Sequence, residues 1–278
     1  MYTFDELFGQ CKENYCNKEA CCHQERQEVC DCSVCLQKQF RAEGTDYYEC
    51  KNKLNCYVLN YGACYISEIY YYLSTSGLLN NFNNSINILS LGCGFAPDYF
   101  AFDKFIKDKN LNLRFNYHGM DNSEVWKYIS WKELPSNTDN PATFYTRDLT
   151  EQNINLKFYD YDIIFLSKIY STIRRNKANT TNFLNNIVKN VQNMKTNSVL
   201  IFHDINSIWE GRDEFDSIVR NEFKGQNINN FYTGKKNWNI PANWKKIDDF
   251  NIIYQNLQLE DNVHKYVKKT IFFEYWKK

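Results

Sequence analysis

Two glycines separated by one residue, Gly92 and Gly94, are the clearest chemical feature of the sequence, in the segment ILSLGCGFAPD at residues 88–98. The apolar run before them predicts a buried strand. Pro97 and Asp98 follow and favour the first turn of a helix. Because glycine has no side chain, a turn of this kind lets the backbone approach a ligand closely. The segment therefore predicts a cofactor-binding loop between a strand and a helix.

Polar residues follow four further predicted strands. In an open parallel sheet, ligands bind beyond the carboxyl ends of the strands, so these positions are candidates for a site. The carboxylate of Asp121, in YHGMD, is placed to accept both hydroxyls of a ribose, and Asp148, in TRDL, to accept the amino group of an adenine. The next two strand ends add Ser167 and Lys168 in FLSKIY, and His203 and Asp204 in IFHDIN.

Short apolar runs alternate with longer amphipathic ones, which predicts parallel strands joined by right-handed helical crossovers. The expected strands are 86–91, 115–120, 143–145, 161–167 and 198–203, followed by a final pair at 251–257 and 266–276. The expected helices are 98–109, 123–134 and 181–194, and one more at 57–79 that Gly77 would end. We thus expect an α/β fold, a Rossmann-like doubly wound and mostly parallel sheet with an antiparallel C-terminal edge.

A G-x-G-x-x-G loop would favour a dinucleotide, but Pro97 replaces the third glycine and disfavours NAD. ILSLGCGFAPD, HGMD and TRDL, in this order, resemble the class I S-adenosylmethionine-dependent methyltransferases, with their LDLGCGxG-like first motif. The resemblance spans roughly residues 65–278. It departs at Ser90, where an acidic residue is common, and at the missing glycine after Phe95. It implies that Gly92 and Gly94 line the methionine part of S-adenosylmethionine, Asp121 its ribose and Asp148 its adenine.

Methyl transfer is an in-line displacement, which mainly requires that the acceptor be held close to the methyl carbon. His203 could act as a base if the acceptor must lose a proton, with Asp204 or a neighbour orienting it. Lys168 is a third catalytic candidate. The fourth strand ends in LSKIY rather than a D/N-P-P-Y/F turn, and no Pro-Cys nucleophile follows, so adenine-amino and cytosine-C5 transfer are disfavoured.

Each of these residues also has an ordinary structural interpretation. The glycine pair could form only a tight turn, Asp121 could cap a helix that begins near Ser123, and Asp148 could cap a turn. The three catalytic candidates could equally be surface or hydrogen-bonded structural side chains.

Ten of the eleven cysteines lie in the first 64 residues, which predicts two parts, a Cys-rich module at 1–64 and a methyltransferase-like domain at 65–278. Clustered thiols in a reducing compartment favour metal binding over disulfides, and we expect two structural zinc ions. An iron-sulfur cluster and redox-active thiols are the alternatives. The candidate metal ligands are Cys11, Cys16, Cys21, Cys22, His23, Cys30, Cys32, Cys35, Cys50, Cys56 and Cys64.

The formal net charge is zero, which excludes a generally basic nucleic-acid-binding protein. No apolar run is long enough for a membrane span and the N-terminus does not resemble a signal peptide, so a cytoplasmic, non-membrane protein is expected. A macromolecular acceptor is favoured, RNA slightly over protein, because basic clusters at 174–177, 235–236, 245–246 and 268–269 could bind phosphates. The alternatives are a small-molecule methyltransferase with a pocket closed by tryptophans (Trp126, Trp131, Trp209, Trp238 and Trp244), and a zinc-bearing scaffold with an inactive fold.

Overall fold

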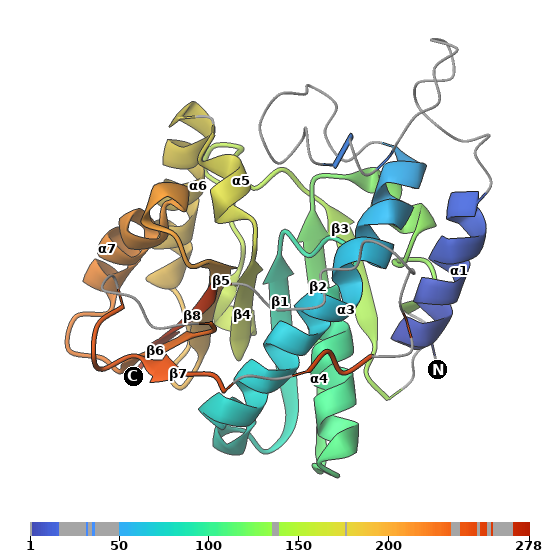
Figure 1. The fold of residues 1–278 in the computed structure, drawn as a ribbon. Helices are drawn as coiled ribbons and strands as arrows, with labels where there is room; N and C mark the ends of the chain where they lie inside the picture. Colours follow the sequence, from blue (N-terminus) through green and yellow to red (C-terminus); the bar gives the residue numbers. More distant parts are fainter. Residues whose placement is uncertain are drawn as a thin grey trace.

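A computed structural model of the chain describes residues 2–16, 32, 35–36, 50–134, 139–175, 177–234, 240–248, 251–254, 257 and 269–278. In this part of the chain, eight strands form one sheet in the order β3-β2-β1-β4-β5-β8-β6-β7 (Figure 1). The strands are β1 (Asn84–Leu91), β2 (Leu113–Asp121), β3 (Ala142–Thr146), β4 (Ile163–Ser167), β5 (Val199–Ile205), β6 (Ile228–Tyr232), β7 (Lys245–Lys246) and β8 (Thr270–Trp276).

The first five strands run parallel to one another, so the predicted mostly parallel, doubly wound sheet is confirmed. The predicted place of the antiparallel strand is wrong. β8 runs antiparallel to β5 on one side and to β6 on the other, so it lies inside the sheet rather than at its edge. β6 was not predicted, because its sequence INNFY carries two asparagines where an apolar run would be expected. The expected strand at 251–257 is also wrong, since residues 251–254 and 257 are not part of a strand.

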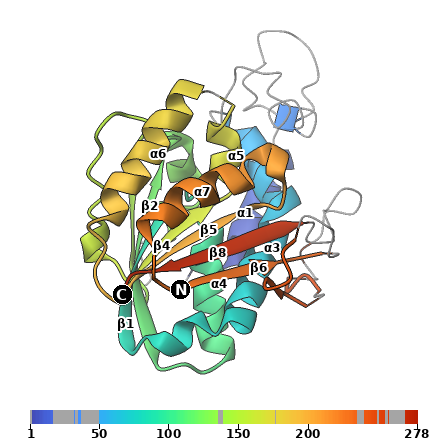
Figure 2. The same cartoon turned by 90° about the vertical axis from the view of Figure 1, so that its left-hand side faces the viewer.

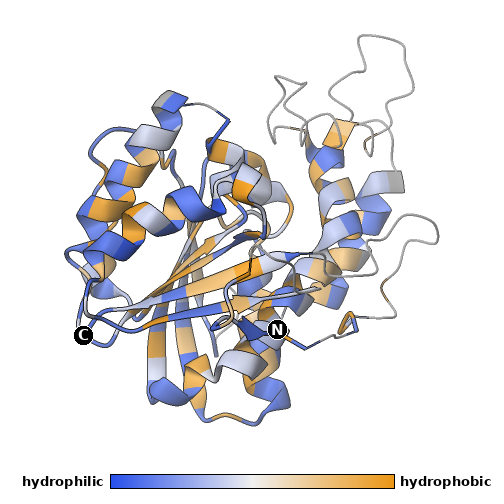
Figure 3. Cartoon of the chain, turned by 60° about the vertical axis from the view of Figure 1, so that its left-hand side comes forward, coloured by the Kyte–Doolittle hydropathy of each residue, from blue (hydrophilic) through white to orange (hydrophobic). Residues whose placement is uncertain are grey.

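The central strands are apolar on both faces because helices cover both faces, and their residues therefore alternate between two cores. Ile88, Ile163 and Ile201 face one core, whereas the next residues along, such as Leu89 and Ile164, face the other. The first core lies under α1 (Phe4–Cys16), α3 (Lys51–Ser76) and α4 (Pro97–Asp108). The second lies under α6 (Lys177–Val191) and α7 (Arg212–Glu222), with the short α5 (Tyr170–Ile173) beside them (Figure 2). Figure 3 shows the same division as apolar strands between helices with polar outer faces.

Helix α3 is the longest element among the described residues and passes through the expected boundary at 64/65. Gly77 ends it as predicted, in the left-handed conformation (φ +64°), and its N–H donates to Leu73 O. The N-terminal part of the chain packs with the body, because Phe4, Leu7 and Phe8 belong to the first core. The division into two parts remains a prediction.

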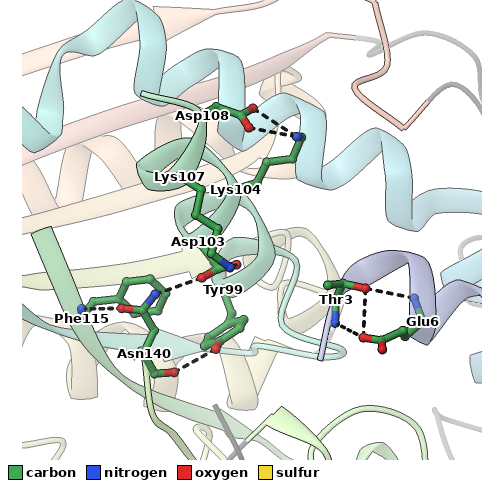
Figure 4. Close-up of polar contacts among 9 residues, drawn as sticks. All are labelled: Thr3, Glu6, Tyr99, Asp103, Lys104, Lys107, Asp108, Phe115 and Asn140. Carbon is green, nitrogen blue, oxygen red and sulfur yellow. Dashed lines mark hydrogen bonds and ion pairs between the residues drawn. The ribbon is translucent and has the colours of Figure 1, made fainter. Parts of the chain in front are cut away.

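Two groups of hydrogen bonds that fix local structure are drawn in Figure 4. Thr3 and Glu6 form a capping box at the start of α1, where the Thr3 N–H donates to Glu6 Oε2 (2.6 Å) and the Glu6 N–H to Thr3 Oγ1 (3.3 Å). Asn140, just before β3, accepts the Phe115 N–H of β2 (3.0 Å) and donates to Asp103 of α4 (2.9 Å). Asn140 therefore ties the sheet edge to the helix that follows the glycine loop.

The predicted helix at 123–134 is instead a short 3₁₀ helix (Glu124–Tyr128) that continues into turns. Its position is fixed by the burial of Trp126 and Trp131 rather than by helix propensity. Among the described residues, no helix has both the length and the apolar character needed to cross a bilayer.

Candidate functional site

The strand order places the glycine loop at the point where the sheet changes direction. From β1 the chain builds outward through β2 and β3, then returns to the other side of β1 for β4 and β5. In open α/β sheets, ligands bind at the carboxyl ends of the two strands that flank this point, here β1 and β4. The glycine loop after β1 and the segment Ser167–Lys168 after β4 therefore belong to one candidate site.

The loop has a backbone that favours glycine. Gly92 (φ +67°) and Gly94 (φ +53°) are both left-handed, and so is Ala96 (φ +67°), which precedes α4. Two successive N–H groups, of Gly92 and Cys93, donate to Met120 O at the end of β2 (2.8 and 3.0 Å). The loop is thus bent sharply and fastened to the neighbouring strand.

Asp121, the last residue of β2, is hydrogen-bonded to the backbone of Gly94. Its Oδ2 accepts the Gly94 N–H (3.0 Å) and its Oδ1 accepts the Ser123 N–H (3.0 Å). Burial raises the pKa of Asp121, and these backbone donors oppose the rise. Asp121 therefore does cap the turn after β2, and it also binds the glycine loop. The Asn122 N–H and the Trp126 side chain also hydrogen-bond to Asp121.

The two glycines differ in what fills the space beside them. A Cβ at Gly92 would lie 2.4 Å from Ile169 Cδ1, so the absent side chain makes room for Ile169 of the segment after β4. At Gly94 the nearest atom is 3.6 Å away, on Trp126, which is ordinary contact. Trp131 Nε1 also donates to Gly94 O (2.8 Å). Ile169 therefore fills the space beside Gly92, whereas the space beside Gly94 is bordered by Trp126.

Asp98 lies buried at the first turn of α4, behind the loop. The Tyr117 hydroxyl donates to its Oδ1 (2.9 Å), and burial raises the pKa of Asp98 to about 6. Ser90, at the position where the resembled family commonly has an acid, is also fully buried.

Asp148 is exposed two residues after β3. Its Oδ1 accepts both the N–H and the hydroxyl of Thr150 (2.8 Å each), so it caps a turn. The hydrogen bonds to Thr150 thus support a structural role for Asp148 as a turn cap. Its contact with adenine remains a prediction.

A buried ionic cluster lies at the ends of β4 and β5. Glu68 Oε2, from the middle of α3, lies 2.9 Å from His203 Nε2 and 2.8 Å from Lys168 Nζ. The side chains of His203 and Glu68 are 0% and 2% exposed, whereas that of Lys168 is 13% exposed. The structure therefore brings two of the predicted catalytic residues together, around a third that was not predicted.

The charges of this cluster follow from its contacts. Burial alone would raise the pKa of Glu68, but the Lys168 ammonium and the hydrogen bonds from His203 and Lys168 outweigh it and lower the pKa. Burial lowers the pKa of His203 to about 4, with Glu68 opposing and Lys168 assisting. At neutral pH the cluster thus holds an ionised carboxylate against a neutral imidazole.

Ser167 Oγ lies 3.1 Å from His203 Nδ1, on the side of the ring opposite Glu68. Asp204 faces elsewhere: its Oδ2 accepts the Ser171 N–H (3.1 Å) at the start of α5, and burial raises its pKa. The neighbour that orients His203 is therefore Glu68 rather than Asp204. Lys168 adopts a left-handed backbone (φ +53°), unusual for a residue with a side chain, and its Nζ lies 4.4 Å from the centre of the Tyr65 ring.

The sequence does carry a signal for Glu68. It is the one acidic residue in YISEIYYYL (residues 65–73), where every other position is apolar, aromatic or serine. A lone carboxylate in such a helix must be paired if its face is buried.

The described cysteines do not gather into a metal site: within the ranges given above, no group of three or more His, Cys, Asp or Glu could hold a metal ion. Cys11 lies in the first core, and burial raises the pKa of its thiol to about 12. Cys32 and Cys56 share a small apolar cluster with Leu36. Cys21, Cys22, His23, Cys30 and the side chain of Cys16 lie outside the described residues.

No protein-family model matches the sequence, and no curated protein matches it. Several solved structures have a similar fold. The plantazolicin methyltransferase BpumL in complex with SAH is 12% identical, with 98% of this chain and 99% of that chain covered and a TM-score of 0.47. An S-adenosylmethionine-dependent methyltransferase from Clostridium acetobutylicum is 13% identical (88% and 98% covered, TM-score 0.42). A TehB-like SAM-dependent methyltransferase from Corynebacterium glutamicum is 11% identical (88% and 96% covered, TM-score 0.40). These likenesses are distant, and we base the functional proposal on this chain's own residues.

Proposed function

We propose that the protein is an S-adenosylmethionine-dependent methyltransferase. The observation that carries the proposal is the glycine loop bound to Asp121 through the Gly94 N–H, at the point where the sheet changes direction. A bent loop and a carboxylate from the next strand are the two groups that a nucleoside bound across strand ends would need.

The residues fit this cofactor in three respects. A Cβ at Gly94 would meet Trp126 only in ordinary contact (3.6 Å), so the backbone of Gly94 is less crowded than that of Gly92. Asp121 holds the loop from the end of the neighbouring strand, where a ribose bound across the strand ends would meet its carboxylate. The buried side chains of Trp126 and Phe95 pack against each other beside the loop and support it. When bound, S-adenosylmethionine supplies an activated methyl group, and the protein residues have to orient the acceptor and exclude water.

For the acceptor we propose a macromolecule. Support comes from two exposed apolar side chains that a large acceptor could cover, Ile205 at the end of β5 (41% exposed) and Trp209 after it (82% exposed). The support for RNA is weaker than the sequence indicates, since Arg174 of the first basic cluster binds Glu214 (2.5 Å) and Trp209 O (2.6 Å). Among the described residues the tryptophans do not line one small pocket: Trp126 and Trp131 are buried beside the loop, and Trp244 packs against Phe273 on the other core.

Label transfer tests the proposal. Protein incubated with methyl-labelled S-adenosylmethionine and separate RNA, protein and small-metabolite fractions of a cell extract should transfer label into the RNA or the protein fraction. Label in metabolites alone would contradict the macromolecular acceptor. An absence of both transfer and cofactor binding by calorimetry at millimolar concentration would favour the scaffold alternative.

Zinc binding by the Cys-rich segment is a separate proposal, which rests on the number and spacing of its thiols. Metal analysis of purified protein should give about two zinc per chain if two four-ligand sites form. A value near zero, with iron also absent, would refute it.

A further inference from the structure

The buried cluster at the ends of β4 and β5 contains a chain of hydrogen bonds in addition to its ion pair. Ser167, His203 and Glu68 form one chain of hydrogen bonds, from Ser167 Oγ to His203 Nδ1 (3.1 Å) and from His203 Nε2 to Glu68 Oε2 (2.9 Å). The chain runs from a partly exposed hydroxyl to two fully buried groups. The β5 backbone and a stacked Phe272 ring (4.2 Å, 2° between planes) hold the imidazole in place.

The direction of each hydrogen bond follows from chemistry. An ionised carboxylate can only accept, so Nε2 of the neutral imidazole carries the proton and donates it to Glu68. Nδ1 is then left with its lone pair, and the Ser167 hydroxyl donates to it. The free lone pairs of Ser167 Oγ are consequently acceptors, and Ser167 is the member of the chain that solvent or a ligand can reach.

We propose that this chain is a proton relay for the methyl acceptor, with Ser167 Oγ touching the acceptor, His203 receiving the proton and Glu68 positioning His203. This inference rests on the proposed function and narrows it: the acceptor is a group that loses a proton when methylated, a hydroxyl or an amine, rather than a thioether or a tertiary amine. Ser167 lies at the end of β4, beside the glycine loop, because Ile169 of the same segment packs on Gly92.

The step balances without a further reactant. The acceptor's O–H or N–H bond breaks and its proton passes to Ser167 Oγ, while the proton of Ser167 passes to His203 Nδ1. The acceptor's electron pair forms the new bond to the methyl carbon, and the electrons of the broken C–S bond stay on sulfur. His203 then carries one positive charge next to the Glu68 carboxylate, and the proton returns to water by way of Ser167.

Three effects set the strength of His203 as a base. Burial lowers the pKa of His203 most, Glu68 opposes this, and Lys168, which binds the same carboxylate oxygen, lowers the pKa further. The titratable groups around His203 are Glu68 of α3, Lys168 after β4, and Cys64 of α3, whose thiol lies 3.9 Å from Glu68 Oε1. Phe272 of β8 and Phe165 of β4 are the uncharged neighbours of the ring.

The first test is nuclear magnetic resonance of protein with ¹⁵N-labelled histidine, which needs no cofactor. At pH 7 His203 should be neutral and protonated on Nε2, and Ser167→Ala should shift the Nδ1 resonance. Glu68→Gln should lower the pKa of His203 further and Lys168→Met should raise it. A His203 that is protonated on Nδ1 at pH 7 would overturn the relay, since that nitrogen could not receive a proton.

The second test is label transfer by Ser167→Ala, with Ser217→Ala on the exposed face of α7 as the matched control. Loss of a positioned proton acceptor should slow transfer about 100-fold, with cofactor binding by calorimetry unchanged, and the control should equal the wild type. Undiminished transfer by Ser167→Ala would refute the relay and leave the proposed function standing. Absence of cofactor binding by the wild type would instead contradict the proposed function itself.

Discussion

Asp98 is the residue at which burial and charge oppose each other most clearly. Its pKa rises from an ordinary 3.8 to about 6 because it is removed from water. A carboxyl with a raised pKa favours the folded state fully below its unfolded pKa, and this contribution is lost as the pH rises through the folded value. At pH 7 the ionised Asp98 therefore lowers the free energy of unfolding.

Replacement by an amide tests this cost. Asp98→Asn keeps an oxygen for the Tyr117 hydroxyl and removes the charge, so the variant should be more stable than the wild type above pH 6, by up to roughly 3 kcal/mol. The difference should shrink as the pH falls toward 4. Urea unfolding of both proteins at pH 4.5 and 7.5 measures it, and an equal difference at the two pH values would show that Asp98 does not titrate in this range.

Three glycines, only one of them in the glycine loop, permit a graded comparison of alanine substitutions. Gly92→Ala combines a left-handed backbone with a Cβ 2.4 Å from Ile169, so it should cost more than about 2 kcal/mol. Gly225→Ala has the same strain (φ +75°) with open space and should cost about 1 kcal/mol. Gly9→Ala, in α1 with open space, should be stabilising by up to about 1 kcal/mol. Thermal unfolding ranks the three, and Gly92→Ala no worse than Gly225→Ala would mean that Ile169 does not pack on the loop.

At the scale of elements, α3 is connected to the sheet by a second buried polar contact besides Glu68. The Tyr72 hydroxyl donates to Glu274 Oε1 of β8 (2.7 Å), and its ring stacks on Phe272 (4.1 Å). Both contacts are shielded from solvent, since Tyr72 is 0% and Glu274 is 2% exposed. They fix how α3 crosses the strands that end at the site.

Tyr72→Phe should therefore cost about 1 to 3 kcal/mol, since it leaves a buried carboxylate oxygen without its donor. The matched control is Tyr70→Phe on the same helix, whose hydroxyl donates to Asp108 (3.0 Å) in a more exposed place and should cost less than about 1 kcal/mol. Urea unfolding of both variants measures the two losses in free energy of unfolding. Equal losses would contradict the claim that burial makes the Tyr72 hydrogen bond the more important one.

The sequence predicts well the strands with apolar runs, β1, β4 and β5, the alternating strand β2, and the helices α4 and α6. Their identity follows from local composition, which is why their positions agree within a few residues. β6 and the place of β8 were missed because strand pairing depends on residues that are distant in sequence. The same holds for the site. The glycine loop is a local motif, whereas Glu68 and His203 are 135 residues apart in sequence and come into contact only when α3 packs on the sheet.

At the scale of the whole molecule, two cores on opposite faces of one sheet leave its strand ends as the place where polar groups from many elements meet. The glycine loop, Asp121, Ser167, His203 and Glu68 come from β1, β2, β4, β5 and α3. The first core, which contains α1 and α3, also connects the N-terminal part of the chain to this edge.

The most direct measurement of the central claim is a crystal structure of the protein with S-adenosylhomocysteine. We predict that the nucleoside lies across Gly94, with its ribose hydroxyls on Asp121 and its sulfur pointing toward Ser167. A nucleoside bound elsewhere, or an Asp121 carboxylate turned away from the sugar, would contradict the account.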